Sequence, residues 1–171
     1  MEISLTFFIN CDKIIQILKG VIMIRNATMK DAESILKLVN ENASKGLMLS
    51  KSPYAVYKDI QAYVVYEENG KILGCARLNI AWNDLAEIAS LAVDMNERGK
   101  GIGKKLVLHL VDRAKYLDIK RVFTLTYQVP FFIKCGFHEV ERQALSYKVF
   151  GDCLSCPKVN NCDEHALIMD I

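Results

Sequence analysis

Apolar residues recur along the chain with two different periods, and the switches between these periods predict alternating strands and helices. Spacings of three and four residues predict helices, whereas stretches rich in β-branched and aromatic residues predict strands. The predicted strands cover residues 21–26, 62–66, 72–82, 85–94, 121–126, 137–141 and 166–171. The predicted helices cover residues 32–39, 53–60, 102–114 and 131–134. This order predicts an α/β (α+β) domain.

Short-range signals support three of these elements. Asn69-Gly70 supplies the positive φ angles that a tight hairpin turn requires. Thr28, with Asp31 three positions later, is a capping-box-like start for the first helix. The strand over 121–126 is apolar on both faces, so we expect it in the interior of the sheet.

The first 22 residues differ from the rest of the chain. They can form a short strand and helix packed on the domain, whereas a membrane-surface segment would need more basic residues. We favour a third interpretation, in which translation begins at Met23. Codons for Lys19-Gly20-Val21 can contain a purine-rich stretch that resembles a bacterial ribosome-binding site. The expected organisation is an extension over 1–22 and one domain over 23–171, with a cysteine-containing loop at 144–165.

Composition narrows the function classes. A chain of 171 residues has the length of one domain, and a net charge of +2 gives no reason to expect nucleic acid. The basic residues cluster locally instead, at Arg98, Lys100, Lys104 and Lys105, which suits a phosphorylated small molecule better than a duplex. The sequence shows no secretory signal and no stretch that could span a membrane, so we expect a cytoplasmic protein with reduced thiols.

The segment from Leu91 to Lys105 carries the clearest chemistry. A strand ends, a turn follows, and a helix begins among Gly99, Gly101 and Gly103. Glycines let the backbone approach a ligand closely, and a helix N-terminus presents unpaired N–H groups and the positive end of its dipole. The segment is not a P-loop, because GxxxxGK[ST] is absent, and its glycine spacing is not that of a dinucleotide fingerprint. It therefore predicts a pyrophosphate site.

This segment resembles a known family. Residues 98–103, Arg-Gly-Lys-Gly-Ile-Gly, match the R/Q-x-x-G-x-G/A signature of the GNAT acetyltransferases, and the element order from Met23 onward is similar to the GNAT fold. Residues 131–137 resemble the family's FYxxxGF segment. The resemblance implies a mixed, splayed sheet of about six to seven strands, with acetyl-CoA as co-substrate. The implied coenzyme contacts are Leu91, Ala92, Val93, Arg98, Gly99, Lys100, Gly101, Ile102, Gly103, Lys104 and Phe132.

A narrower resemblance points to the acetyltransferase domain of N-acetylglutamate synthases, in particular the short bacterial form without an amino-acid-kinase domain. The segments that carry it are 82–93, 122–126, 152–158 and 162–164. It implies transfer of the acetyl group to the α-amine of L-glutamate, the first step of arginine biosynthesis. GNAT domains often dimerise, so the resemblance also leaves a homodimer open.

Three residues are candidates for catalysis. Glu87 lies six residues before Val93 on one strand, so both follow one alternating register, and the resemblance puts the general base there. By the same resemblance, the Val93 N–H polarises the thioester carbonyl. Many relatives protonate the leaving thiolate with a tyrosine where this chain has Phe132. Tyr127 or water could replace that tyrosine, although Tyr127 could also be an ordinary residue of the rim.

A dicarboxylate acceptor needs cationic partners. Lys51 is the first candidate, because its setting resembles a basic segment of the short synthases. Arg77 is the second and Arg25 the third, and Thr126 could donate a hydrogen bond at the end of its strand. A basic groove would favour glutamate and an acidic one a polyamine. Other acceptors stay open (a protein N-terminus, a lysine, an antibiotic), as does a non-catalytic CoA-binding or metal-sensing module.

Three cysteines and a histidine near the C-terminus have metal-like spacing. Cys153, Cys156, Cys162 and His165 could close a tetrahedral structural zinc site. The main alternative is three reduced thiols and a surface histidine, followed by an iron–sulfur cluster and then a disulfide.

Overall fold

The computed structural model describes residues 22–145 and 161–171, and within them the predicted order of elements is confirmed. The strands are β1 (Met23–Asn26), β2 (Tyr63–Glu68), β3 (Lys71–Trp82), β4 (Leu85–Val93), β5 (Arg121–Thr126), β6 (His138–Val140) and β7 (His165–Asp170). The helices are α2 (Ala32–Ala43), α3 (Pro53–Lys58), α4 (Ile102–Tyr116) and α5 (Val129–Lys134). None of the helices in these ranges is long and apolar enough to cross a membrane.

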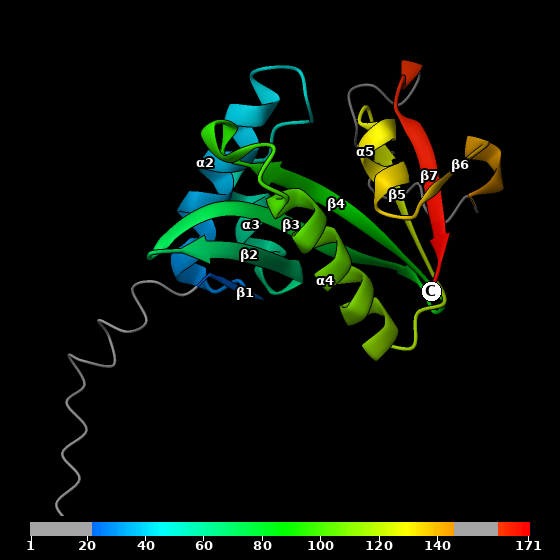
Figure 1. Cartoon of the computed structure of the whole chain (residues 1–171), viewed down its shortest axis with the longest axis horizontal. Coiled ribbons are helices and arrows are strands. Elements are labelled where there is room, and N and C mark those ends of the chain that lie inside the picture. The colour runs from blue at the N-terminus through cyan, green and yellow to red at the C-terminus, as the bar shows by residue number, and fades with distance from the viewer. Residues whose placement is uncertain (1–21, 146–160) are drawn as a thin grey trace, which may run out of the picture.

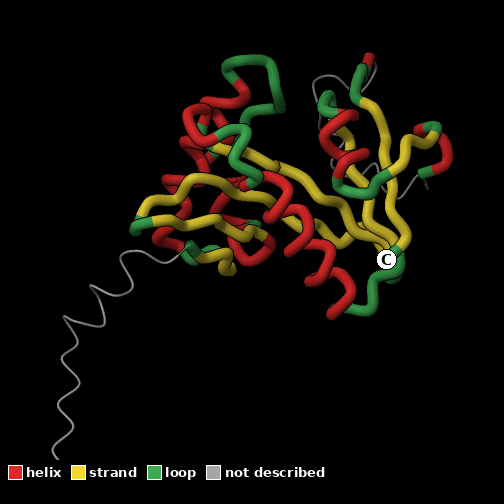
Figure 2. Tube along the Cα trace, viewed as in Figure 1, coloured by secondary structure: helices red, strands yellow, loops and turns green. Residues whose placement is uncertain are grey.

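The strands form one mixed sheet in the order β1-β2-β3-β4-β5-β7-β6. Neighbours are antiparallel except β4 and β5, which are parallel and pair only through residues 85–87 and 121–123. β5 pairs with β7 along its whole length. Beyond Glu87 and Phe123 the two parallel strands therefore diverge, and the sheet opens into the V seen in Figures 1 and 2. The interior position predicted for the strand over 121–126 is confirmed.

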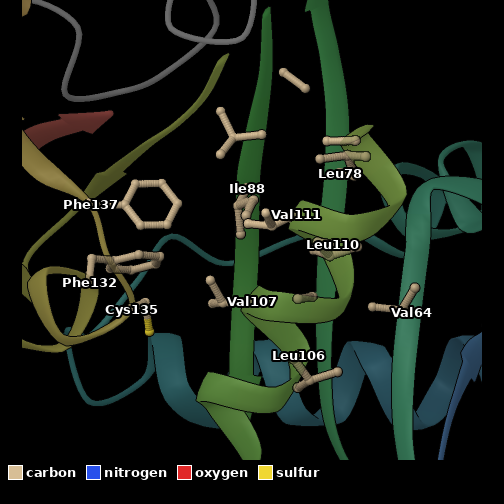
Figure 3. Packing of buried hydrophobic residues seen from close by; sticks show 14 of the residues in the cluster. Val64, Leu78, Ile88, Leu106, Val107, Leu110, Val111, Phe132, Cys135 and Phe137 are labelled. Carbon is tan, nitrogen blue, oxygen red and sulfur yellow. The ribbon is translucent and has the colours of Figure 1, made fainter. Parts of the chain in front are cut away.

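Helix α4 packs on one face of the sheet through an apolar stripe. Ile102, Leu106 and Leu110 recur every four residues and are at most 3% exposed. They belong to the same cluster as Leu78 of β3 and Ile88 of β4 (Figure 3). Burial of such side chains stabilises a fold by roughly 1.5–3 kcal/mol each. This packing fixes the start of α4 against the end of β4.

Helix α2 covers the opposite face, where a second cluster forms. Ile35 and Val39 are fully buried there with Val65 and Cys75. Burial raises the pKa of the Cys75 thiol to about 12. This thiol is therefore protonated at neutral pH and acts as a packing group.

Local turn chemistry confirms one boundary and corrects another. Asn69 and Gly70 adopt φ angles of 53° and 75°, as the hairpin prediction requires. The helix expected over 53–60 ends at Lys58 instead. Asp59 leaves the helical conformation and pairs with Arg77.

An ion cluster ties β1 to the start of α2. Asp31 is 5% exposed and accepts two hydrogen bonds from Arg25, at 2.7 and 2.8 Å, and one from the Thr28 N–H at 2.8 Å. Arg25 also bonds Glu67 of β2 at 2.8 Å. The Arg25 hydrogen bonds hold the pKa of Asp31 down at about 2. Arg25, the third acceptor-binding candidate, is engaged in this cluster and does not line the cavity described below.

The Asp31 cluster predicts an acid-dependent loss of stability. Because the pKa of Asp31 is lower in the folded than in the unfolded chain, its contribution is complete above about pH 4 and disappears as the pH falls towards 2. We expect Asp31→Asn to lower the free energy of unfolding at pH 7 by about 2 kcal/mol. Urea denaturation of both proteins at pH 7 and pH 3 would measure it.

Asp84→Asn is the matched control, because the Asp84–Arg121 pair is about 40% exposed on both sides and such pairs contribute little. An Asp31→Asn effect that stays constant between pH 7 and pH 3 would contradict the prediction.

Candidate functional site

A cavity of about 570 Å³ lies where β4 and β5 separate. Residues 88–91 of β4 and 124–126 of β5 line it, together with the glycine turn before α4, part of α5 and the segment before α3. Here the facing edges of the two strands have no β4–β5 pairing. Their backbone N–H and C=O groups can therefore form hydrogen bonds to an extended ligand that takes the place of a strand.

The glycine turn forms one end of the cavity. Gly99 and Gly101 both have φ of 81°, a left-handed conformation that glycine adopts without strain, and Gly101 is the N-cap of α4. Gly103 lies close to α5, since an added Cβ would lie 3.3 Å from the Phe131 ring. The first residues of α4 line the cavity, so the helix N-terminus can receive an anion there.

Two of the four clustered basic residues face the cavity. Arg98 and Lys104 line it, whereas Lys100 and Lys105 do not. Lys100 bonds Glu97 at 2.7 Å, and the Lys105 ammonium lies 5.6 Å from the centre of the Tyr66 ring. The expected coenzyme contact through the Lys100 side chain is therefore not part of the observed cavity.

A β-bulge in β4 changes the register expected for its side chains. Ser90 has a φ of 52°, and the pairing with β3 shifts around it. Val93 consequently packs in the α4 cluster, although unbroken alternation from Glu87 would place it on the other face. Ala92, expected at the coenzyme, is buried in the α2 cluster. Glu87 and Val93 thus project to opposite faces of the sheet, and both line the cavity.

The cavity also gathers predicted acceptor groups. Lys51, Arg77, Glu87 and Thr126 all line it. Arg77 is only 5% exposed and pairs with Asp59 at 2.5 Å, so much of its charge is already balanced. The Glu87 carboxylate accepts a hydrogen bond from Asn79 at 3.5 Å.

Thr126 has a local role as well. Its hydroxyl accepts a hydrogen bond from the Gln128 N–H at 3.0 Å, at the turn into α5.

Arg142 lines the cavity and was not predicted. It follows edge strand β6, and its guanidinium donates to the Cys162 carbonyl at 3.5 Å. No local pattern marks it, because the pairing of β6 with β7 and of β7 with β5 brings its segment to the cavity. Among the described lining residues, six are Lys or Arg and three are Glu. The cavity is therefore basic.

The two aromatic candidates are placed differently, because Phe132 lines the cavity and Tyr127 does not. Tyr127 does not line the cavity but borders a second one of about 500 Å³. Its hydroxyl donates to Asp163 at 2.7 Å, so the geometry does not support Tyr127 as the proton donor. Phe132 touches the cavity but is 3% exposed, and it packs edge-to-face on Phe131 and on Phe137. Its ring also packs in the α4 cluster (Figure 3).

Half of the predicted zinc site lies outside the described residues, namely Cys153 and Cys156. Of the other two, Cys162 lines the cavity and His165 contacts Glu139 at 2.5 Å. Within 22–145 and 161–171, no group of three or more metal-binding side chains is found. The zinc site stays a prediction.

Comparison with known proteins agrees with this geometry. Residues 32–137 match the model of the Acetyltransferase (GNAT) family. An amino-acid acetyltransferase of Mycobacterium tuberculosis is 36% identical over 133 residues, which cover 76% of each chain. The fold superposes on the crystal structure of Rv2747 from M. tuberculosis in complex with CoA and NLQ, with a TM-score of 0.77, 30% identity, and coverage of 87% of this chain and 99% of that one.

A second solved structure extends the comparison. N-acetylglutamate synthase from Neisseria gonorrhoeae, complexed with coenzyme A and N-acetyl-glutamate, superposes with a TM-score of 0.79 at 28% identity. The match covers 88% of this chain and 35% of the synthase. The chain thus corresponds to about a third of that protein.

The glycine turn generates a prediction with an internal control. Gly101→Ala and Gly70→Ala both place a Cβ at a positive φ with open space around it. Each should lower the free energy of unfolding by about 1–2 kcal/mol. Only Gly101→Ala should also weaken CoA binding, by about tenfold or ~1.4 kcal/mol, because its backbone forms the turn. Thermal denaturation and calorimetric titration with CoA measure the two effects. Equal CoA affinities in the two variants would argue against the assigned turn.

Proposed function

Because the chain belongs to the Acetyltransferase (GNAT) family and is an acetyl-CoA-dependent N-acetyltransferase, we propose that its acceptor is the α-amine of L-glutamate. The observation that carries this proposal is the charge of the cavity. Six Lys or Arg side chains against three Glu suit an anionic acceptor and disfavour a polyamine. Similarity to an amino-acid acetyltransferase and to a synthase solved with N-acetyl-glutamate supports the same choice.

The coenzyme would lie along the opening between the strands. The N–H groups at the start of α4, with Arg98 and Lys104, would bind its pyrophosphate. The backbone edge of β4 beyond the bulge would bond the extended pantetheine arm, in the place where β5 has separated from β4. The glycine turn, Arg98, Lys104 and residues 88–91 of β4 all line the cavity.

Glu87 would act as the general base. A neutral amine attacks, and its nitrogen becomes positively charged as the C–N bond forms. A carboxylate near it can then take a proton from that nitrogen, directly or through one water. The thioester carbonyl gains negative charge in the same step, and the Val93 N–H is the donor that the family resemblance assigns to it. The C–S bond then breaks, and the thiolate of CoA takes a proton from water. Phe132 has no proton to give, and the Tyr127 hydroxyl is bonded to Asp163 outside the cavity.

The two carboxylates of glutamate would each need a cation. Lys51 and Arg142 line the cavity from different elements and are our candidates for these contacts. Arg77 is already paired with Asp59, so it would contribute to the structure of the site more than to substrate binding. The product, N-acetylglutamate, would enter arginine biosynthesis in the cytoplasm.

Removing the base predicts a specific kinetic change. Glu87→Gln keeps the size of the side chain but cannot accept the amine proton. We expect kcat to fall by about 10²–10⁴-fold with little change in CoA affinity. Stopped-flow thiol release and calorimetric titration with CoA measure the two quantities. Full turnover in Glu87→Gln would assign the base to another group.

The choice of acceptor is tested by a panel of amines. Thiol release from acetyl-CoA should be fastest with L-glutamate and slower with L-glutamine, L-lysine, spermidine and a short peptide. Lys51→Ala should raise the KM for L-glutamate by about tenfold, the size expected when a charge-assisted bond is lost, and the KM for L-glutamine less. Faster turnover of spermidine than of L-glutamate would overturn the proposed acceptor.

A further inference from the structure

The last turn of α2 carries two asparagines, and each bonds a different residue that lines the cavity. Asn42 accepts a hydrogen bond from the guanidinium of Arg98, the residue before the glycine turn. Asn40 bonds the backbone of Lys51, the first candidate for binding the acceptor. Neither asparagine belongs to a motif that the sequence patterns single out.

Asn42 uses all of its amide. It is 3% exposed, and its Nδ2 donates to the Leu38 carbonyl at 2.8 Å and to the Val93 carbonyl at 3.3 Å. With both donors directed at carbonyls, the amide oxygen must face Arg98. One side chain thus connects α2, the end of β4 and the residue before the glycine turn. The guanidinium has five N–H donors in a rigid fork, so fixing one of them orients the others.

Asn40 forms its hydrogen bonds to backbone groups instead of to a side chain. Its Nδ2 donates to the Lys51 carbonyl at 3.1 Å, and its Oδ1 accepts from the Lys51 N–H at 2.9 Å. Ser52, the next residue, caps α3 by accepting from the Ala55 N–H at 3.2 Å. Asn40 therefore fixes the point from which the Lys51 side chain extends.

The two contacts diverge because of helix geometry. Residues two apart on an α-helix differ in direction by about 200°, so Asn40 faces the segment before α3 while Asn42 faces β4. The end of α2 lies between the two regions, which we assign to different substrates.

We propose that Asn42 and Asn40 are positioning residues that set the affinities for the two substrates separately. Asn42 acts on acetyl-CoA through Arg98, and Asn40 acts on the acceptor through Lys51. The Asn40 half rests on the proposed acceptor site, whereas the Asn42 half needs only the coenzyme. A merely structural role would lower stability in both variants without separating the two affinities.

The same substitution at both positions provides the test. In Asn42→Ser the hydroxyl can still donate to the Leu38 carbonyl, as serine commonly does within helices, but it is too short to reach Arg98. We expect the Kd for CoA, measured by calorimetry, to rise about tenfold in Asn42→Ser, the loss expected for a hydrogen bond to a charged group, and less than about twofold in Asn40→Ser. The KM for L-glutamate should show the reverse order. Equal changes in both affinities in both variants would overturn the proposal.

A double-mutant cycle tests whether Asn42 acts through Arg98. In an Arg98→Ala background, Asn42→Ser should weaken CoA binding no further. Additive losses would overturn the Asn42 half. The absence of turnover by the unmodified protein with every amine of the panel would overturn the proposed acceptor and the Asn40 half with it. The CoA titrations decide the Asn42 half in either case.

Discussion

Parallel pairing between β4 and β5 stops after residues 85–87 and 121–123, and the rest of the site depends on where it stops. A buried strand edge without a partner is costly, because each backbone N–H and C=O needs a hydrogen bond. In this protein the two edges instead border a cavity, where water or a ligand can bond them. The separation would both create the binding site and supply part of its hydrogen-bonding capacity.

Two further features keep the strands apart. The bulge at Ser90 reverses the faces of the residues that follow it. Val93 therefore packs against α4 at the end of β4, just before the glycine turn. On the other arm, Phe132 and Phe137 pack against each other and in the same cluster as α4. The packing on α4 therefore holds both arms of the V, and the site inherits the rigidity of the core.

Much of the fold follows from local patterns. The order of elements, the Asn69-Gly70 turn and the glycine turn before α4 all depend on residues close together in sequence, where period and glycine content are informative. The bulge at Ser90 carries neither glycine nor proline, so the reversal of Val93 was invisible in the sequence. The positions of Arg142 and Asn42 in the site could not be predicted from local patterns. Each residue approaches its partners only after segments distant in sequence have paired. The hydrogen bond from Tyr127 to Asp163 also lies beyond local patterns, because the two residues are 36 positions apart.

The excess of positive side chains in the cavity has an energetic consequence for the empty protein. Like charges held near one another in a partly desolvated space repel, and this repulsion opposes folding until anions enter. Salt screens such repulsion over about 8–10 Å at moderate ionic strength. Added salt should therefore stabilise the protein without its substrates and weaken its attraction for them. The ionic strength that gives the highest free energy of unfolding is thus not the one that gives the tightest binding.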